Sequence, residues 1–433
     1  MKAYLSYTER LSGRIDPPSS KNYTTRYLLV AALAEGESLV RFPAVSDDAA
    51  AMVRCLRDLG ATIEEEEDRE GRFLRILGFG RRPRAPGRLD PGNAGAVLRL
   101  LIGVGALLPE IRFETAFGES LGQRPHGDLL DALGQLGLAC ESVDGRLPLI
   151  LRGGPPQGGL VRVSGARSSQ YLSALLFLAP LLQRGMTIEV TGGLVSKPLV
   201  RTTLEVMRQA GIEVEAEDDL LYFQVPGGQA YLAREYKVNG DFPSAAAILA
   251  AGAVTESRIE VSRLYEDSQG ERAAIPVLRE MGARVDHEGE TVRLASNGRL
   301  WGVEFDGDQA TDMVLAMVAA ACLAEGTSRF YNVANLRLKE CDRIAVPALE
   351  LERLGVAVRT GAGELSITGR PEGYEGGIEV ETHHDHRVAQ MLAIVGLRCR
   401  RGLTILDAEN VSKSYPDFFA DLARLGARVE LGD

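Results

Sequence analysis

The chain has 433 residues, of which 45% are hydrophobic and 25% charged, and its formal net charge is −11. This composition is typical of a globular protein, and the acidic balance argues against a general nucleic-acid or membrane surface. No apolar run approaches the roughly 18 residues that span a bilayer, and the N-terminal MKAYLSYTER lacks the apolar core of a secretory signal. We therefore expect a cytoplasmic protein that binds neither membrane nor nucleic acid.

From the N-terminus onward, the chain alternates two kinds of predicted helix. The first kind is Ala-rich and apolar on nearly all sides, and its copies begin near Ser20, Asn93, Ser168, Asp241, Asp312 and Asp385. The second kind is amphipathic and is followed by a glycine and a short strand, with the glycines at Gly60, Gly137, Gly211, Gly282, Gly355 and Gly426. Copies of each kind recur at intervals of about 73 residues, which indicates six copies of one repeat.

The residue pattern within a repeat predicts its architecture. An Ala-rich helix such as residues 313–324 has no polar face to give to water, so we expect these helices to be buried. The glycine after each amphipathic helix can adopt the left-handed conformation that ends a helix. Strand-like segments flank both helices, as in SLVRF from Ser38 and ATIEE from Ala61. The repeat therefore reads βαβαββ, with the Ala-rich helix inside.

Six repeats are too many for one hydrophobic core, because cores stop growing at roughly 250 to 300 residues. We predict an α/β fold of two domains, each an inside-out barrel of three repeats with buried inner helices. The strand AYLSYT, starting at Ala3, has no repeat of its own, so we expect the N-terminus to complete the sixth repeat. The expected domains are residues 13–230 and residues 1–12 plus 231–433, joined by two crossings that form a hinge beside a cleft.

Cations gather near the predicted starts of the inner helices, at Lys21, Arg26, Arg99 and Arg387. The helix dipole disfavours cations in a first turn, whereas the same helix end attracts anions. The alternative is that these side chains are solvated and that the nearby Ser and Asp residues are ordinary N-caps. Because cations recur in several repeats at helix starts, where the dipole disfavours them, we interpret these helix starts as anion-binding sites.

Other polar segments have plain alternatives. Residues 335–343, NLRLKECDR, also fit an exposed helix with charge pairs four residues apart. The run HHDH at His383–His386 has no Cys or carboxylate partner at ligand spacing, so we expect no metal site. Neither a GxxxxGK[ST] motif nor a strand-linked GxGxxG motif is present, which gives a nucleotide cofactor no support. The five cysteines lack metal-type spacing and indicate thiols in a reducing compartment.

Ten motifs occur in order along nearly the whole chain: SSKNYTTR, GNAGAVLR, QRPHGDLL, RSSQYLSALL, LVSKP, GDFPSAAA, TDMVLA, NLRLKECDR, HHDHRVAQ and VSKSYPDFF. Together they resemble the enolpyruvyl transferase family, and most closely its members that act on shikimate 3-phosphate. The resemblance implies two domains that close around two small anionic substrates, phosphoenolpyruvate and shikimate 3-phosphate. It also implies a monomer that needs no cofactor.

The resemblance further implies roles for individual residues. Phosphoenolpyruvate would be bound by Lys21, Asn93, Gly95, Arg124, Gln170, Arg343, Arg387 and Lys413. Shikimate 3-phosphate would be bound by Lys21, Asn22, Arg26, Ser168, Ser169, Gln170, Ser196, Asp312, Asn335 and Lys339. Glu340 would protonate the methylene carbon, Asp312 would accept the hydroxyl proton, and Lys21 would assist proton transfer. The sequence leaves the protonation of Glu340 open, because desolvation and the neighbouring cations act in opposite directions.

The chain departs from the usual family pattern at several positions, of which Asn22 and Leu199 flank the acceptor. Asn22 replaces a serine, Ala96 replaces a common threonine, Leu199 replaces an aromatic residue, and HHDHR replaces the more usual N-D-H-R. One alternative is therefore the relative that uses UDP-N-acetylglucosamine, but that enzyme usually carries a cysteine in the loop that reads FGESLGQRPHG here. A ring-shaped DNA clamp would share the repeats, yet the apolar inner helices could not face phosphate backbones.

Overall fold

The computed structural model describes residues 1–432, which form two compact units. We call residues 19–239 the continuous unit, and residues 1–18 together with 240 onward the split unit. The predicted boundaries, after residues 12 and 230, lie upstream of the observed ones at Pro18 and Asn239. The strand just before each crossing pairs within the unit that the chain is about to leave. Each crossing therefore lies further along the chain than predicted.

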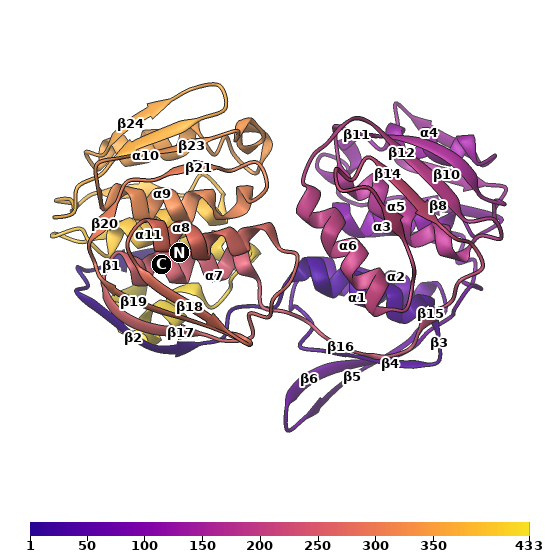
Figure 1. The fold of residues 1–433 in the computed structure, drawn as a ribbon, viewed down its shortest axis with the longest axis horizontal. Helices are drawn as coiled ribbons and strands as arrows, with labels where there is room; N and C mark the ends of the chain where they lie inside the picture. Colours follow the sequence, from indigo (N-terminus) through magenta and orange to yellow (C-terminus); the bar gives the residue numbers. More distant parts are fainter. Residues whose placement is uncertain (433) are drawn as a thin grey trace. The chain divides into compact units, whose positions relative to one another are not determined.

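Three four-stranded sheets of the same design surround the helices of the continuous unit (Figure 1). The first sheet has the order β16 (Glu235–Lys237), β4 (Glu37–Arg41), β6 (Gly71–Leu77) and β5 (Thr62–Asp68). The second has the order β7 (Arg88–Leu89), β8 (Glu110–Phe113), β10 (Arg146–Arg152) and β9 (Ala139–Val143). The third has the order β11 (Gly159–Gly165), β12 (Met186–Leu194), β14 (Tyr222–Val225) and β13 (Glu215–Ala216). A short parallel pair joins β15 (Tyr231–Leu232) to β3 (Ala34–Glu35).

The helices of the continuous unit divide into the two predicted kinds. The Ala-rich or apolar inner helices are α1 (Lys21–Leu33), α3 (Gly95–Gly105) and α5 (Ser169–Leu178). The amphipathic helices are α2 (Asp47–Asp58), α4 (Gly127–Gln135) and α6 (Lys197–Gln209), and the short 3-10 helices are η1 (Leu121–Gln123) and η2 (Ala179–Leu181). Nearly every residue of α1, α3 and α5 is buried, as their apolar composition predicts. These helices supply much of one hydrophobic core.

The split unit repeats this design with three further sheets. Their orders are β18 (Arg284–Glu288), β19 (Thr291–Asn297), β17 (Glu256–Val261) and β2 (Arg10–Ile15); β21 (Glu304–Asp306), β23 (Thr327–Tyr331), β25 (Leu365–Thr368) and β24 (Ala357–Thr360); and β26 (Glu379–Glu381), β27 (Leu403–Leu406), β1 (Lys2–Leu5) and β28 (Val429–Gly432). A two-stranded pair joins β20 (Leu300–Trp301) to β22 (Ala324–Glu325). In every four-stranded sheet of residues 1–432, one outer pair of strands is parallel and the other pairs are antiparallel.

Three buried helices lie at the centre of the split unit, where α9 contacts both α7 and α11 (Figure 1). The inner helices are α7 (Phe242–Ala253), α9 (Val314–Cys322) and α11 (His386–Gly396), and all of their residues are buried. The outer helices are α8 (Ala274–Glu280), α10 (Ala345–Arg353) and α12 (Phe418–Arg424). The 3-10 helices are η3 (Gly270–Ala273), η4 (Thr311–Met313), η5 (Ala334–Leu338) and η6 (Ala408–Lys413).

Helix α7 shows how the sequence specifies an inner helix. Asp241 caps it by accepting a hydrogen bond from the backbone N–H of Ser244 at 3.1 Å, and Pro243 lies in the first turn, where no N–H is needed. A Cβ at Gly252 would lie 2.6 Å from Cδ1 of Ile259, so glycine allows the helix to lie close to β17. Small residues on all sides let α7 pack tightly in the core.

The N-terminal strand behaves as predicted, but two other strands are exchanged. Strand β1 pairs with β27 and β28 and completes the last sheet. The predicted domain bounds placed residues 13–15, in β2, with the continuous unit and β16 with the split unit. Instead, β2 pairs in parallel with β17 of the split unit, and β16 pairs in parallel with β4 of the continuous unit. Each strand thus joins the unit the chain is about to leave, which moves the crossings downstream.

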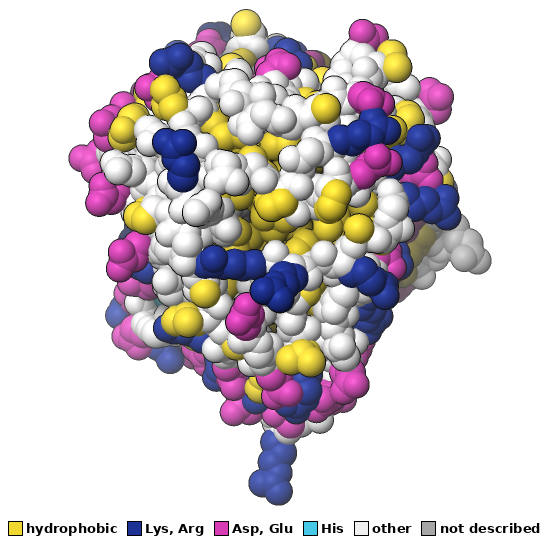
Figure 2. Space-filling view, turned by 90° about the vertical axis from the view of Figure 1, so that its right-hand side faces the viewer, with side chains coloured by type: hydrophobic (Ala, Val, Ile, Leu, Met, Phe, Trp, Pro, Cys, Tyr) yellow, Lys and Arg dark blue, Asp and Glu magenta, His cyan; other side chains and the backbone are white. Residues whose placement is uncertain are grey.

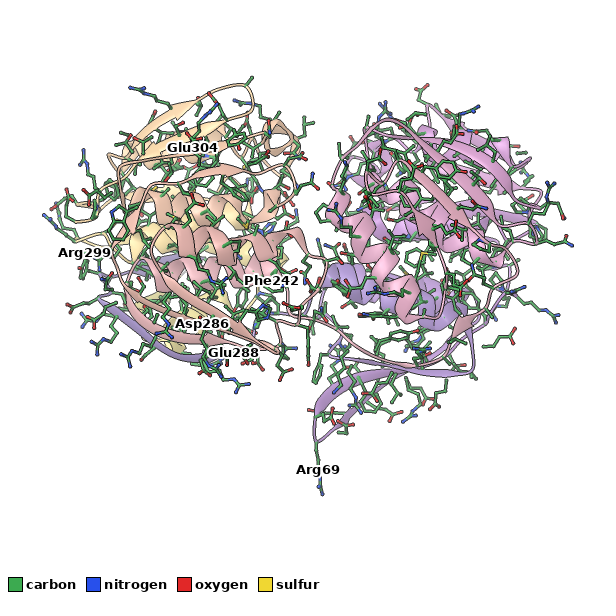
Figure 3. All side chains as sticks on the ribbon, viewed as in Figure 1. Arg69, Phe242, Asp286, Glu288, Arg299 and Glu304 are labelled. Atoms are coloured by element: carbon green, nitrogen blue, oxygen red, sulfur yellow. The ribbon has the colours of Figure 1, made fainter. Side chains whose placement is uncertain are left out.

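The surface mixes charges of both signs. On the face in Figure 2, Lys and Arg side chains are interspersed with Asp and Glu side chains. Some of these cations form exposed ion pairs with carboxylates; Nε of Arg152, for example, lies 2.7 Å from Oε2 of Glu110. Figure 3 shows Arg69 at the tip of the hairpin between β5 and β6. Within residues 1–432, no helix is both long enough and apolar enough to cross a membrane.

Candidate active site

In the continuous unit, the start of α1 places a cation at a helix N-terminus. Lys21 is the first residue of α1, its side chain is about half exposed, and its Nζ lies 3.9 Å from Oδ2 of Asp48. This distance leaves the ammonium group weakly paired. Because the first backbone N–H groups of a helix also lack intrahelical partners, an anion here would meet both kinds of donor.

Arg26 is buried one turn further along α1 and is held by neutral oxygens. Its Nε donates to Oγ1 of Thr203 at 2.9 Å, and its two Nη atoms donate to the backbone oxygens of Asn22 and Leu199. Burial lowers the pKa of Arg26 to about 10, and no carboxylate in the described chain forms an ion pair with it. An uncompensated buried guanidinium favours an anionic or hydroxyl-rich ligand.

The same network links the three helices α1, α5 and α6. Oγ1 of Thr203, in α6, lies 2.9 Å from Oγ of Ser173, in α5. Ser168 caps α5 by accepting the backbone N–H of Gln170, and Ser169 begins that helix and is buried. Ser196 precedes α6 in the left-handed conformation. The hydroxyl residues predicted from the sequence therefore lie at the starts of two helices that are linked to Arg26.

Two further guanidinium groups converge on the start of α3. A Cβ at Gly95 would lie 2.9 Å from Nη1 of Arg124 and 3.8 Å from Nη1 of Arg99. Arg99 donates to Oε1 of Gln170 at 2.6 Å, and desolvation lowers its pKa with help from Arg124. Asn93 precedes α3 by one residue beyond its cap, Ala94. Glycine at position 95 thus leaves room for two cations beside a helix N-terminus.

In the split unit, the predicted residues form one charged network. Oδ1 of Asp312 accepts from Nζ of Lys339 at 3.2 Å and from Nη1 of Arg343 at 3.1 Å. Glu340 accepts from Nη2 of Arg343 and from Nζ of Lys413, each at 2.8 Å. These residues come from η4, from the segment after η5 and from η6, so the fold joins three distant parts of the sequence.

The sequence analysis missed the contact of Asp385 with the side chain of Arg343, which it makes in addition to capping α11 at Arg387. Its carboxylate accepts from Nε of Arg343 at 2.8 Å and from the backbone N–H of Arg387 at 2.8 Å. Asp385 is fully buried, and both arginines are nearly so. The Asp before a helix was interpreted only as an N-cap, because a sequence does not show which distant cation its second oxygen meets.

Arg387 and Asn335 keep buried atoms without hydrogen-bond partners in the described residues. Arg387 bonds through Nη1 to Gln390, and its Nη2 lies 3.8 Å from Oδ2 of Asp241, while its Nε has no partner. Oδ1 of Asn335, on η5, is also unpartnered. Since buried polar atoms are normally hydrogen-bonded, both residues are suited to receive a polar ligand.

The charged network decides the ionisation that the sequence left open. Desolvation raises the pKa of Glu340, but Arg343 and Lys413 outweigh it and lower the pKa to about 2. Desolvation also opposes ionisation of Asp312, yet Lys339, Arg343 and Arg387 hold its pKa well below the usual range. With the contacts seen in the structure, both carboxyls are therefore ionised at neutral pH.

The histidine run serves local structure. His383 contacts Oε1 of Glu350 at 2.9 Å, and burial beside Arg387 and Arg343 lowers the pKa of His386 to about 2. No cluster of three His, Cys, Asp or Glu residues among residues 1–432 is arranged to hold a metal ion.

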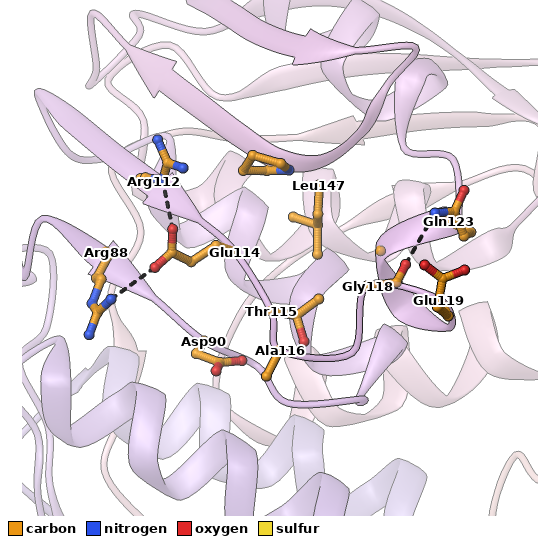
Figure 4. A pocket seen from close by; sticks show the side chains of 12 residues that line it. Arg88, Asp90, Arg112, Glu114, Thr115, Ala116, Gly118, Glu119, Gln123 and Leu147 are labelled. Carbon is orange, nitrogen blue, oxygen red and sulfur yellow. Dashed lines mark hydrogen bonds and ion pairs between the residues drawn. The ribbon is translucent and has the colours of Figure 1, made fainter.

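A separate cavity of about 600 Å³ lies in the continuous unit beside η1 (Figure 4). Three of its charged groups are paired with one another, because Glu114 contacts Arg88 at 3.0 Å and Arg112 at 2.8 Å. None of the predicted site residues lines it. We therefore place the candidate active site at the helix starts rather than in this cavity.

In the continuous unit the helix starts carry cations and hydroxyls, and in the split unit two carboxylates lie among cations. Each arrangement is suited to small anionic ligands. The fold is that of the enolpyruvyl transferases. The enolpyruvyl transferase NikO from Streptomyces tendae, 18% identical, superposes with a TM-score of 0.75 over 99% of this chain and 98% of the other. EPSP synthase from Acinetobacter baumannii superposes with a TM-score of 0.88 over 100% of both chains, at 25% identity.

The sequence comparisons identify the particular family. The family model described as EPSP synthase (3-phosphoshikimate 1-carboxyvinyltransferase) matches residues 5–422. The 3-phosphoshikimate 1-carboxyvinyltransferase of Deinococcus radiodurans is 49% identical over 424 residues, which cover 98% of this chain and 95% of the relative. The chain belongs to the EPSP synthase family.

Proposed function

We propose that this enzyme transfers the enolpyruvyl group of phosphoenolpyruvate to the 5-hydroxyl of shikimate 3-phosphate and releases phosphate. Family membership supports the reaction, and the charged network around Arg343 supports the assignment of chemistry to residues. The same assignment places the enzyme in the shikimate pathway, which leads to the aromatic amino acids. The proposal uses no cofactor, because every step transfers only protons and a phosphate leaving group.

The reaction needs a base and an acid. In the proposed first step, the carboxylate of Asp312 accepts the proton of the 5-hydroxyl while its oxygen attacks C2 of phosphoenolpyruvate. Glu340 delivers a proton to C3, which gives a tetrahedral ketal that carries the phosphate. Glu340 then removes a proton from C3 as the C2–O bond to phosphate breaks and the vinyl ether forms, and the proton held by Asp312 passes to the departing phosphate. Groups of this kind typically contribute about 10² to 10⁴ in rate.

Glu340 must acquire a proton before it can act as the acid. In the structure, Arg343 and Lys413 keep it ionised. We propose that the carboxylate and phosphate of phosphoenolpyruvate take up these two cations, which removes the charges that lower its pKa. Desolvation, which already raises the pKa of Glu340, then favours the protonated form. Substrate binding thus allows Glu340 to take up the proton that it later delivers.

We assign substrate binding to the residues predicted from the sequence. Phosphoenolpyruvate is bound by Lys21, Asn93, Gly95, Arg124, Gln170, Arg343, Arg387 and Lys413. Shikimate 3-phosphate is bound by Lys21, Asn22, Arg26, Ser168, Ser169, Gln170, Ser196, Asp312, Asn335 and Lys339. Helix starts with unpaired N–H groups and Arg forks suit phosphate and carboxylate groups. The proposal includes closure of the units on the substrates, a monomeric state and a cytoplasmic location, which suits five free cysteines.

The acceptor is tested by phosphate release from phosphoenolpyruvate. We expect steady turnover with shikimate 3-phosphate and none with UDP-N-acetylglucosamine. Restoring the usual aromatic residue with Leu199→Tyr is a matched test of the departure beside the acceptor, and we expect it to change the KM of shikimate 3-phosphate without creating a new acceptor. Turnover with UDP-N-acetylglucosamine alone would overturn the proposed acceptor.

A further inference from the structure

Gln390 holds the guanidinium of Arg387 but was not among the predicted site residues. Both residues lie in α11, about one turn apart, and both side chains are buried. Oε1 of Gln390 accepts a hydrogen bond from Nη1 of Arg387 at 3.1 Å. Because a guanidinium only donates hydrogen bonds, the amide must face the arginine with its oxygen. The amide nitrogen, Nε2, has no hydrogen-bond partner in residues 1–432.

The contact with Gln390 fixes the orientation of Arg387, because the other nitrogens of the guanidinium are not held. Nη2 lies 3.8 Å from Oδ2 of Asp241, which is beyond hydrogen-bond reach, and Nε has no partner in the part of the chain that the structure describes. Asp241 is engaged elsewhere, since its Oδ2 accepts from both the backbone N–H and the hydroxyl of Ser244 at 3.1 and 2.6 Å. Gln390 is therefore the side chain that holds this guanidinium.

The kind of acceptor distinguishes Arg387 from the other buried arginine of the split unit. Arg343 donates at 2.8 to 3.1 Å to three carboxylates, those of Asp312, Glu340 and Asp385. A carboxylate holds an arginine and also cancels its charge, whereas an amide oxygen holds it and leaves the charge in place. An arginine that is oriented by a neutral group can therefore give its full charge to an anionic ligand.

Neutral acceptors also hold the buried arginines near the helix starts of the continuous unit. Arg26 donates through Nε to Oγ1 of Thr203 at 2.9 Å, and Arg99 donates through Nη1 to Oε1 of Gln170 at 2.6 Å. These arginines and Arg387 are among the cations that the sequence analysis interpreted as anion-binding. The pairing of Arg387 with an amide thus follows a pattern that recurs in three repeats.

We propose that Gln390 is a positioning residue for phosphoenolpyruvate: its neutral amide orients Arg387 and leaves the whole charge of the guanidinium for an anionic group of the substrate. This inference rests on the proposed role of Arg387 in binding phosphoenolpyruvate. Because Gln390 acts through Arg387, its loss weakens the binding of this substrate more than it slows the chemical step. The expected signature is a higher KM for phosphoenolpyruvate, with kcat and the KM for shikimate 3-phosphate little changed.

Two variants of Gln390 test the hydrogen bond and the neutrality of the acceptor. Gln390→Met removes the acceptor at similar side-chain length in an apolar helix, and we expect the KM for phosphoenolpyruvate to rise about tenfold, because a hydrogen bond to a charged group is lost. Gln390→Glu keeps an acceptor of the same shape but adds a charge that neutralises Arg387, and we expect at least the same rise. A purely structural role would predict that this isosteric change is tolerated.

Melting temperatures and a neighbouring control show whether the effect is specific. Met391→Leu changes the next buried residue of α11 at nearly constant volume, and it should keep the wild-type KM for both substrates. Gln390→Met should melt near the wild type, because it also removes the unpaired Nε2 from the core. A wild-type KM for phosphoenolpyruvate in either Gln390 variant would overturn the proposal.

A double-mutant cycle separates this inference from the proposed function. Arg387→Met alone should raise the KM for phosphoenolpyruvate, and adding Gln390→Met should change it little further, because the glutamine then has no arginine to orient. Effects of the two changes that multiply would overturn the inference while the role of Arg387 stands. A wild-type KM for Arg387→Met would overturn both the proposed role of Arg387 and the inference that rests on it.

Discussion

Asp385→Asn tests whether one buried carboxylate holds the arginine at the centre of the site. Asparagine is as good an N-cap as aspartate, so the variant keeps the cap of α11 but loses the charge. It replaces Oδ2, which accepts from Nε of Arg343 at 2.8 Å, with an amide that donates, while Oδ1 still caps the helix and can accept from Nη2 of Arg343 at 3.2 Å. The variant therefore mainly weakens the contacts that hold the guanidinium of Arg343, which is nearly fully buried.

The structure sets the size of the effect. Breaking a buried ion pair typically costs about 3 to 5 kcal/mol. Arg343 retains Asp312 and Glu340 as partners, so we expect the lower end, about 3 kcal/mol, of the range for buried pairs. For a unit of this size, that loss lowers the melting temperature by roughly 6 to 12 °C. Displacement of one Arg–anion contact should also raise the KM of phosphoenolpyruvate by about tenfold or more.

Calorimetry and steady-state kinetics measure the two effects of Asp385→Asn. The matched control is Glu364→Gln, which breaks the exposed ion pair with Arg329 at 2.6 Å in the same unit. We expect that control to cost less than about 1 kcal/mol, because exposed pairs contribute little. If Asp385→Asn has the same melting temperature as the control and the wild-type KM for phosphoenolpyruvate, Asp385 does not position Arg343.

Three further predictions concern single residues. Glu340→Gln should bind both substrates nearly normally and lower kcat by about 10² or more, and wild-type turnover would exclude it as the acid. Gly95→Ala should raise the KM of phosphoenolpyruvate by about tenfold with little change for shikimate 3-phosphate, because the new Cβ meets Nη1 of Arg124 at 2.9 Å; equal effects on both substrates would argue against this site. Desolvation, together with the charges of Asp312 and Asp241, raises the pKa of Glu271, in η3, from 4.5 to about 8, so its stabilising contribution is complete below pH 4.5 and is lost as the pH rises through 8. Thermal melts should show Glu271→Gln losing less stability than the wild type across that range, and identical pH slopes would refute the shift.

The fold was predictable because its signals are local and repeated. The apolar inner helices are buried as expected, and all six glycines after the outer helices adopt positive φ. The exchange of β2 and β16 was not predictable, since a short strand carries no signal for which of two equivalent sheets it joins. Because of this exchange, the observed domain boundaries lie downstream of the predicted ones.

The electrostatics of the candidate site were not predictable from the sequence. The structure joins Asp312, Glu340, Arg343 and Lys413, which the resemblance named as site residues, in one network, and their roles stay predictions. It also shows that the cations outweigh desolvation at Glu340, which depends on distances that a sequence does not contain. Asp385 escaped notice because its sequence context indicates an ordinary helix cap.

Deuterium incorporation from heavy water tests the central claim that Glu340 adds and removes a proton at C3 of phosphoenolpyruvate. We expect mass spectrometry to find deuterium in the vinyl group of the product and in recovered phosphoenolpyruvate, only when shikimate 3-phosphate is present. Glu340→Gln should abolish this incorporation. Normal turnover in which the wild-type product carries no deuterium would contradict the addition of a proton at C3 and with it the role of the acid.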